Sequence, residues 1–123
     1  MLHIAAICLG ASLGALARWQ LGLWLSTAGQ LPWGTLAANA IGGYLIGAVL
    51  AVLQAMPELS PVWRLAIVTG FLGALTTFST FSAEVVSLLQ AQRWFTALAW
   101  AGAHLLASLS LTIIGMWSVQ ALR

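Results

Sequence analysis

The sequence predicts an all-α integral membrane protein with four transmembrane helices, the third of which is broken near its middle. Of its residues, 62% are hydrophobic and only 5% are charged, and the mean hydropathy is +1.02. A chain with so few ionic groups cannot solvate a globule of this size. Its three prolines, Pro32, Pro57 and Pro61, all lie between long apolar runs, where a helix stops or starts. These two observations define the fold class.

The prolines divide the chain into four helices, which we expect to form one domain over residues 1–123. The helices are expected at about residues 2–26, 33–55, 62–90 and 94–122. Each is long enough to span, because about 20 residues cross a hydrocarbon core of about 30 Å. Six of the seven tryptophans fall near the expected ends, where their amphipathic rings favour the membrane interface. Trp100 is the exception, because it lies well inside the fourth helix.

The first two helices each carry a stripe of small or polar residues at a spacing of four. On the first helix the stripe contains Gly10, Gly14 and Arg18. On the second helix it contains Thr35, Asn39, Gly43 and Gly47. The glycines favour close packing of helices. Arg18 and Asn39 are expected to face water or a polar partner, because an unpaired polar group in hydrocarbon is costly.

The third helix is too long for a straight perpendicular span, since about 29 residues extend roughly 43 Å. Its segment from Gly70 to Ser82, GFLGALTTFSTFS, places glycines, five hydroxyl side chains and three phenylalanines in an otherwise apolar stretch. We therefore expect a break near residues 73–77. Unwound backbone at membrane depth survives only where protein buries it or where it lines a wet cavity. This segment is the first place to look for an ion.

Residues after the expected break form two faces. Thr77, Thr80 and Glu84 share one face, while Phe78 and Phe81 share another. An aromatic ring is positive at its edge, so edge-on phenyl rings with hydroxyl donors and the Asn39 amide suit a weakly held small anion. Free carbonyls in an unwound stretch suit a cation instead. Both ions are compatible with the same segment.

On the fourth helix His104, Ser108 and Thr112 form a line at a spacing of four. Two interpretations remain open for this line. It is either a polar track beside a pore or a set of side chains that hydrogen-bond back to helix carbonyls, as serine and threonine often do in membranes.

The charges are balanced across the expected topology. Arg64 and Arg123 lie on one side of the membrane, and Arg18 and Arg93 lie on the other. The positive-inside rule therefore gives no preferred orientation. Such a chain is suited to insert both ways and to pair as two oppositely oriented copies around a twofold axis.

Three segments together resemble the bacterial fluoride channels called Fluc, of the CrcB family. They are GASLGALARW (residues 10–19), GTLAANAIGGYLIG (residues 34–47) and GFLGALTTFSTFS (residues 70–82). Their order, spacing and helix positions agree along the full chain. The resemblance implies a passive, fluoride-selective channel that expels fluoride through the bacterial inner membrane and lowers fluoride toxicity. It also implies an antiparallel, dual-topology homodimer with two pores.

The resemblance assigns roles to particular residues. Phe78 and Phe81 would be the pore phenylalanines, and Asn39 a pore-lining amide. The other pore residues implied are Ser79, Thr80, Ser108 and Thr112, and Arg18 would lie in an aqueous vestibule. A structural sodium ion at the dimer axis would be bound by the backbone carbonyls of Gly73 and Thr76. Two positions depart from the expected pattern, namely Ala74, where a glycine is usual, and the bulky, titratable His104.

The main alternative is a proton-coupled small multidrug-type exporter, another short four-helix protein that works as an antiparallel dimer. Such a carrier needs an acidic residue in its binding chamber, normally on the first helix. This first helix contains Arg18 and no acid, and the only intramembrane carboxylate is Glu84.

A purely structural subunit would explain the glycines but not the hydroxyl and phenyl cluster. The sequence shows no nucleophile–base pair, no cluster of metal ligands and no phosphate-binding loop, so it gives no indication of an enzyme. The expected partners are fluoride, a second copy and lipid, without nucleic acid or another protein.

Overall fold

A computed structural model describes residues 1–25 and 31–123, and all the regular secondary structure in these ranges is helical. Helix α1 covers Leu2–Leu25, α2 covers Trp33–Ala55 and α6 covers Trp94–Ala121. The third expected helix is present in pieces: α3 (Pro61–Arg64), the π-helix η1 (Leu65–Leu72), α4 (Gly73–Leu75) and α5 (Phe78–Gln90). The expected four helices with a broken third helix are therefore confirmed.

The helix boundaries differ from the expected ones by at most one residue within the described ranges. The expected first-helix end at residue 26 lies outside the described residues. The third helix begins at Pro61, because proline fits the first helical position and the Ser60 hydroxyl accepts a hydrogen bond from the Val62 N–H at 3.4 Å. The fourth ends at Ala121, one residue early, as expected for a fraying terminus.

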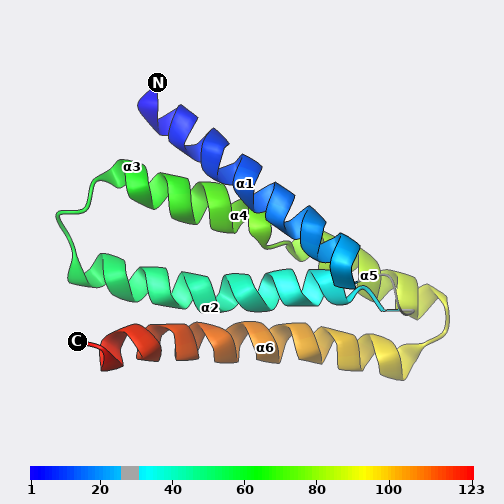
Figure 1. Ribbon diagram of the computed structural model, residues 1–123. Coiled ribbons are helices and arrows are strands. Elements are labelled where there is room, and N and C mark those ends of the chain that lie inside the picture. Colours follow the sequence, from blue (N-terminus) through cyan, green and yellow to red (C-terminus); the bar gives the residue numbers. More distant parts are fainter. Residues whose placement is uncertain (26–30) are drawn as a thin grey trace.

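The helices run in two directions (Figure 1). Helix α1 and the segmented third helix run from one end of the molecule to the other, whereas α2 and α6 run back. The N-terminus, the α2–α3 connection and the C-terminus consequently lie at one end. The α5–α6 connection lies at the opposite end, as the four-span topology predicts.

Glycines set the closest approaches between helices, as the striped pattern predicted. A Cβ atom added to Gly47 on α2 would overlap the carbonyl oxygen of Thr112 on α6. A Cβ added to Gly115 on α6 would in turn overlap the carbonyl of Tyr44. Helix α1 packs on the third helix in the same manner, because a Cβ at Gly10 would overlap the carbonyl of Ala66. These contacts bring backbone against backbone.

The π-helical segment η1 is an addition that the sequence did not predict. It covers eight residues of the third helix ahead of the break. Gly70 lies buried within it, and a Cβ there would lie 2.7 Å from the carbonyl oxygen of Ile7. The widened helix therefore packs tightly on α1.

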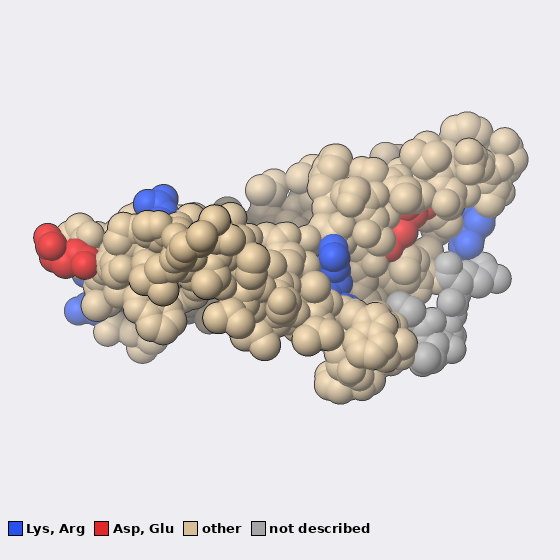
Figure 2. All heavy atoms as spheres, turned by 90° about the horizontal axis from the view of Figure 1, so that it is seen from above, with Lys and Arg blue, Asp and Glu red and all other residues tan. Residues whose placement is uncertain are grey.

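Large apolar side chains cover the outside of the molecule rather than its interior. Leu9, Leu106 and Trp117 are each about two-thirds exposed. Figure 2 shows a face that is mostly uncharged, with charged groups at both ends and a few nearer the middle. The four spans are all long and apolar enough to cross a bilayer. The molecule is a multi-pass membrane protein.

Candidate functional site

The third helix is interrupted at Thr76 and Thr77. Both residues have extended backbone, with φ −83° and ψ 155° at Thr76 and φ −152° and ψ 121° at Thr77. The break therefore occupies the C-terminal end of the expected range 73–77, since Gly73 to Leu75 remain helical. A new helix, α5, starts at once, because the Thr77 hydroxyl accepts a hydrogen bond from the Thr80 N–H at 3.2 Å.

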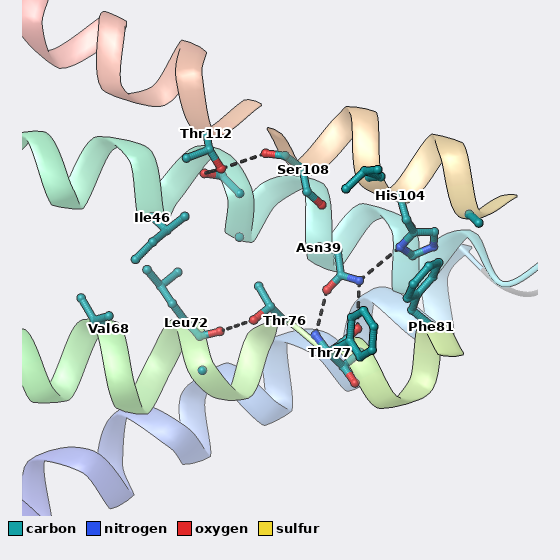
Figure 3. A pocket seen from close by; sticks show the side chains of 16 residues that line it. Asn39, Ile46, Val68, Leu72, Thr76, Thr77, Phe81, His104, Ser108 and Thr112 are labelled. Atoms are coloured by element: carbon teal, nitrogen blue, oxygen red, sulfur yellow. Dashed lines mark hydrogen bonds between the residues drawn. The ribbon is translucent and has the colours of Figure 1, made fainter. Parts of the chain in front are cut away.

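Asn39 on α2 clamps the broken backbone. Its Oδ1 accepts a hydrogen bond from the Thr77 N–H at 2.8 Å, and its Nδ2 donates to the Thr77 carbonyl at 3.0 Å (Figure 3). A side-chain amide thus replaces both backbone partners that Thr77 would have in a continuous helix. Such replacement is required in a bilayer, where an unpaired peptide group costs several kcal/mol. Asn39 therefore positions the break as well as lining the adjacent cavity.

The break leaves four backbone carbonyls without their helical donors, those of Gly73, Ala74, Leu75 and Thr76. In a continuous helix the Gly73 carbonyl would accept from the Thr77 N–H, which here bonds to Asn39. The Thr76 carbonyl would accept from the Thr80 N–H, which here bonds to the Thr77 hydroxyl. Gly73 is exposed, and a Cβ there would meet only the Val68 carbonyl oxygen, at 3.5 Å. The two carbonyls that the resemblance assigns to a cation are therefore among the four that lose their helical donors.

His104 on α6 forms the next layer of the site. The Asn39 Nδ2 donates to His104 Nδ1 at 3.2 Å. The imidazole is only 4% exposed, and its centroid lies 4.6 Å from that of Phe81 and 5.1 Å from that of Trp100. His104 is thus fixed between an amide and two aromatic rings.

Glu84 on α5 lies beyond His104 and is also hydrogen-bonded. The Thr35 hydroxyl donates to its Oε1, and the Trp100 indole N–H donates to its Oε2 at 3.0 Å. His104 Nε2 lies 3.9 Å from the same Oε2. The sequence did not predict this network, but it carried a signal for it: Trp100 and Glu84 are the tryptophan and the carboxylate that lie away from helix ends.

A cavity of about 710 Å³ lies beside the break, between α2, the third helix and α6 (Figure 3). It brings together most of the residues that the sequence singled out. Its lining includes Asn39, Gly73, Thr76, Phe78, Phe81, Ser108 and Thr112. The two phenyl rings meet edge to face, with centroids 5.5 Å apart and planes at 62°. Phe78 is 79% exposed, so this wall of the cavity is open in the single chain.

Three of the expected site residues lie outside this cavity. The Ser79 hydroxyl pairs with the Thr77 hydroxyl at 3.3 Å. Thr80 instead lines a second cavity of about 360 Å³, together with Glu84, Ser87 and Arg93 among others. Arg18 is half-buried and lines neither of these two cavities.

The line of polar residues on α6 divides between the two interpretations left open above. The Thr112 hydroxyl donates to the Ser108 carbonyl at 2.8 Å and lies 3.0 Å from the Gly43 carbonyl. It is therefore bonded to backbone. His104 instead directs its Nδ1 toward α2, and Ser108 lines the cavity. The line as a whole therefore fits neither interpretation alone.

A multi-pass protein with a broken helix, freed carbonyls and a phenyl- and hydroxyl-lined cavity at its centre has the features of an ion-conducting membrane protein. Comparison with known proteins gives the family. The model of the family described as "CrcB-like protein, Camphor Resistance (CrcB)" matches residues 5–116. This chain belongs to that family.

Curated relatives cover nearly the whole chain. The "Fluoride-specific ion channel FluC" of Albidiferax ferrireducens is 64% identical over 116 residues, which are 94% of this chain and 89% of the relative. The protein of the same name from Variovorax paradoxus is 61% identical over 122 residues, covering 99% and 98%. That from Bordetella pertussis is 56% identical over 122 residues, covering 98% and 94%.

Proposed function

We propose that this protein is a passive fluoride-selective channel. It is a single four-helix domain that exports fluoride from the bacterial cytoplasm through the inner membrane and so lowers fluoride toxicity. The observation that carries the proposal is the cavity at the break, where Phe78 and Phe81 present a ring pair beside the Ser108 hydroxyl and the Asn39 clamp. Curated relatives that cover almost the whole chain are named fluoride-specific ion channels. The protein is accordingly a channel and not an enzyme.

The chemistry of the cavity suits a small anion that must pass through. Positive ring edges and the Ser108 hydroxyl attract fluoride without the deep trap that a lysine would make. Among the described residues, no Lys or Arg lines the larger cavity. Weak contacts allow an ion to enter and also to leave. In this pathway Ser79 and Thr80 lie next to the phenylalanines, and Arg18 attracts the anion at the membrane surface.

The pore is completed in our proposal by a second, oppositely oriented copy. Phe78 is 79% exposed and Gly73 is exposed on the same open side of the cavity. The cationic side chains are evenly divided, since Arg64 and Arg123 belong to one end and Arg18 and Arg93 to the other. An antiparallel homodimer covers the open phenyl wall of each copy and yields two pores. It requires no other protein partner.

A sodium ion at the dimer axis fits the broken helix. The carbonyls of Gly73 and Thr76 lack their helical donors, and unwound carbonyls of this type coordinate sodium in membrane proteins. Two copies would contribute these carbonyls to one ion, which would hold the breaks together. Replacing sodium by N-methylglucamine during purification is expected to lower the midpoint of thermal unfolding. An unchanged midpoint would contradict a structural sodium ion.

The direction of transport follows from charge and potential. A passive anion channel lets a negative-inside potential expel fluoride, and 100 mV supplies about 2.3 kcal/mol per charge, enough for roughly fifty-fold depletion. The alternative, a proton-coupled multidrug exporter, needs a carboxylate exposed to a cationic substrate. Both oxygens of Glu84 instead accept hydrogen bonds from Thr35 and Trp100. The relatives' names also favour the channel over the exporter.

The test is anion efflux from liposomes that contain only the purified protein. Liposomes are loaded with fluoride or chloride, and a potassium ionophore clamps the voltage. Rapid loss of fluoride with retention of chloride is the expected result. Folded protein that releases neither anion, or releases both equally, would overturn the proposal.

Variants locate the pathway within the same assay. Phe81→Ile removes a ring that lines the cavity and is expected to reduce fluoride flux at least tenfold. Phe95→Ile is the matched control, because Phe95 is 90% exposed at the start of α6 and lines neither cavity. Equal flux in both variants would remove Phe81 from the pathway.

A further inference from the structure

His104 has a fixed hydrogen-bonding role that the fluoride proposal does not use. The orientation of the Asn39 amide is determined by Thr77, because a backbone N–H can only donate and a backbone carbonyl can only accept. The atom of Asn39 that faces Thr77 N is therefore oxygen, and the atom that faces the Thr77 carbonyl is nitrogen. The same nitrogen faces His104 Nδ1 at 3.2 Å.

This arrangement determines the tautomer of the imidazole. Asn39 Nδ2 is a donor, so His104 Nδ1 must accept and carries no proton. A neutral imidazole then carries its proton on Nε2. That N–H is buried without a hydrogen-bond partner among the described residues, since Glu84 Oε2 at 3.9 Å is beyond hydrogen-bond distance. The tautomer that accepts a hydrogen bond at Nδ1 therefore leaves the N–H at Nε2 unpaired.

We propose that His104 is a positioning residue that holds Asn39 against the broken helix through its unprotonated Nδ1. The position of Thr77 therefore depends on a chain of contacts from α6 through α2 to the third helix. Protonation of Nδ1 would place an N–H donor against the Asn39 N–H donor. The amide cannot rotate to restore the contact without losing both of its bonds to Thr77. An imidazolium at this position therefore releases the clamp.

Few titratable side chains lie close enough to His104 to change the protonation of its imidazole. Glu84 on α5 is the titratable side chain that faces His104 among the described residues. From α2 the ring meets the neutral Asn39, and its aromatic neighbours are Phe81 on α5 and Trp100 on α6. Glu84 already accepts from Thr35 and Trp100. It attracts a proton toward Nε2 and offers nothing to Nδ1.

The expected consequence is acid inhibition of conduction, and this part rests on the proposed function. Fluoride flux should fall about tenfold for each pH unit below the titration of His104, as the neutral fraction falls. The change His104→Asn places an amide oxygen at the position of Nδ1, so it keeps an acceptor for Asn39 but cannot titrate. It should conduct at neutral pH with a flat profile. His104→Leu removes the acceptor and should reduce flux at every pH.

The experiment measures fluoride efflux from liposomes between about pH 8 and about pH 5, with protein-free liposomes reporting the leak of HF through lipid. The matched control is His3→Gln, which changes the other histidine of the chain and should keep the acid inhibition. Acid inhibition in the wild type and the His3 variant, absent in His104→Asn, supports the proposal. Equal acid inhibition in all three proteins, or none in the wild type over the range where His104 titrates, overturns it.

A second measurement does not depend on conduction. Nitrogen-15 NMR of histidine-labelled protein, with His3→Gln for assignment, reports the tautomer of His104 directly. The expected state at neutral pH is Nε2–H with an unprotonated Nδ1, and the same spectra give the pH at which the imidazolium forms. A proton on Nδ1 at neutral pH overturns the inference. Wild-type liposomes that conduct no fluoride would instead contradict the proposed function, while the tautomer would still test this one.

Discussion

Two regions of this molecule hold its helices together by different means. In the first, which we call the glycine contacts (Gly10 and Gly14 against the third helix, Gly47 and Gly115 between α2 and α6), backbone meets backbone without side chains. In the second, which we call the polar centre (Asn39, Thr77, His104, Glu84 and Trp100), side chains replace the hydrogen bonds of an interrupted helix. The first region depends on shape and the second on donors and acceptors.

The difference shows where a membrane protein can place function. At the contact between α2 and α6 both helices are continuous, so the backbone is satisfied internally and only close packing is required. At the polar centre the helix is open, and each freed group must find a partner or an ion. The cavity, the freed carbonyls and the buried imidazole all lie here. A break in a helix therefore concentrates chemistry that a continuous span cannot present.

The largest effect is expected from Asn39→Leu, which removes the clamp from the polar centre. The Thr77 N–H and carbonyl would both lose their partners, at a cost of several kcal/mol each in a water-free site. We expect little or no folded protein, measured as the monodisperse fraction in size-exclusion chromatography. Gln54→Leu is the control, because it changes an exposed amide on the same helix. Equal yields of the two variants would contradict the clamp.

A smaller effect is expected from Gly47→Ala in the glycine contacts. The added methyl overlaps the Thr112 carbonyl, so α2 and α6 must separate, and overpacking of this kind costs about 1–3 kcal/mol or more. A lower midpoint of thermal unfolding should result. Gly102→Ala adds the same methyl on α6 with nothing within 4 Å, and it should leave the midpoint unchanged or raise it. The opposite order would show that shape does not limit this contact.

Trp100→Phe tests the outer part of the polar centre. It keeps a buried aromatic ring but removes the N–H that donates to Glu84 Oε2, and the loss of a hydrogen bond to a charged group costs about 1.5–3 kcal/mol. Thermal stability should fall clearly. Trp117→Phe is the comparison, since that ring is 68% exposed and should change little. If both changes had the same small effect, the hydrogen bond from Trp100 to Glu84 would not contribute to stability.

The smallest effect is expected outside both regions, at the turn between α5 and α6. Gln92 has φ 58°, a left-handed conformation that glycine adopts without steric cost, and the Arg93 N–H bonds to the Leu88 carbonyl across the turn. Gln92→Gly should therefore stabilise the protein by at most about 1 kcal/mol. Ala91→Gly, at φ −79°, should destabilise it instead. Chemical unfolding in mild detergent would compare the free energies of unfolding of the two variants. A less stable Gln92→Gly than Ala91→Gly would contradict backbone strain at Gln92.

Apolar patterning and prolines were enough to predict the number of spans, their boundaries within the described ranges and a break in the third span. Apolar length fixes the spans because a bilayer has a fixed thickness, and prolines fix their ends. The cluster from Gly70 to Ser82 predicted the break, because glycines loosen a helix and unwound backbone at membrane depth survives beside a wet cavity. The spacing of Gly43 and Gly47 also predicted their packing role, since a stripe of small residues has one face to offer.

The pairing of polar groups between helices could not be predicted from the sequence. Asn39 and Thr77 are 38 positions apart, and Thr35 and Glu84 are 49 apart, so no local spacing pairs them. The tautomer of His104 follows from the orientation of an amide on another helix. Trp100 was recognisable as an exception, but its hydrogen bond to Glu84 was not. Hydrogen bonds between helices depend on rotation and register, which packing of the whole bundle sets.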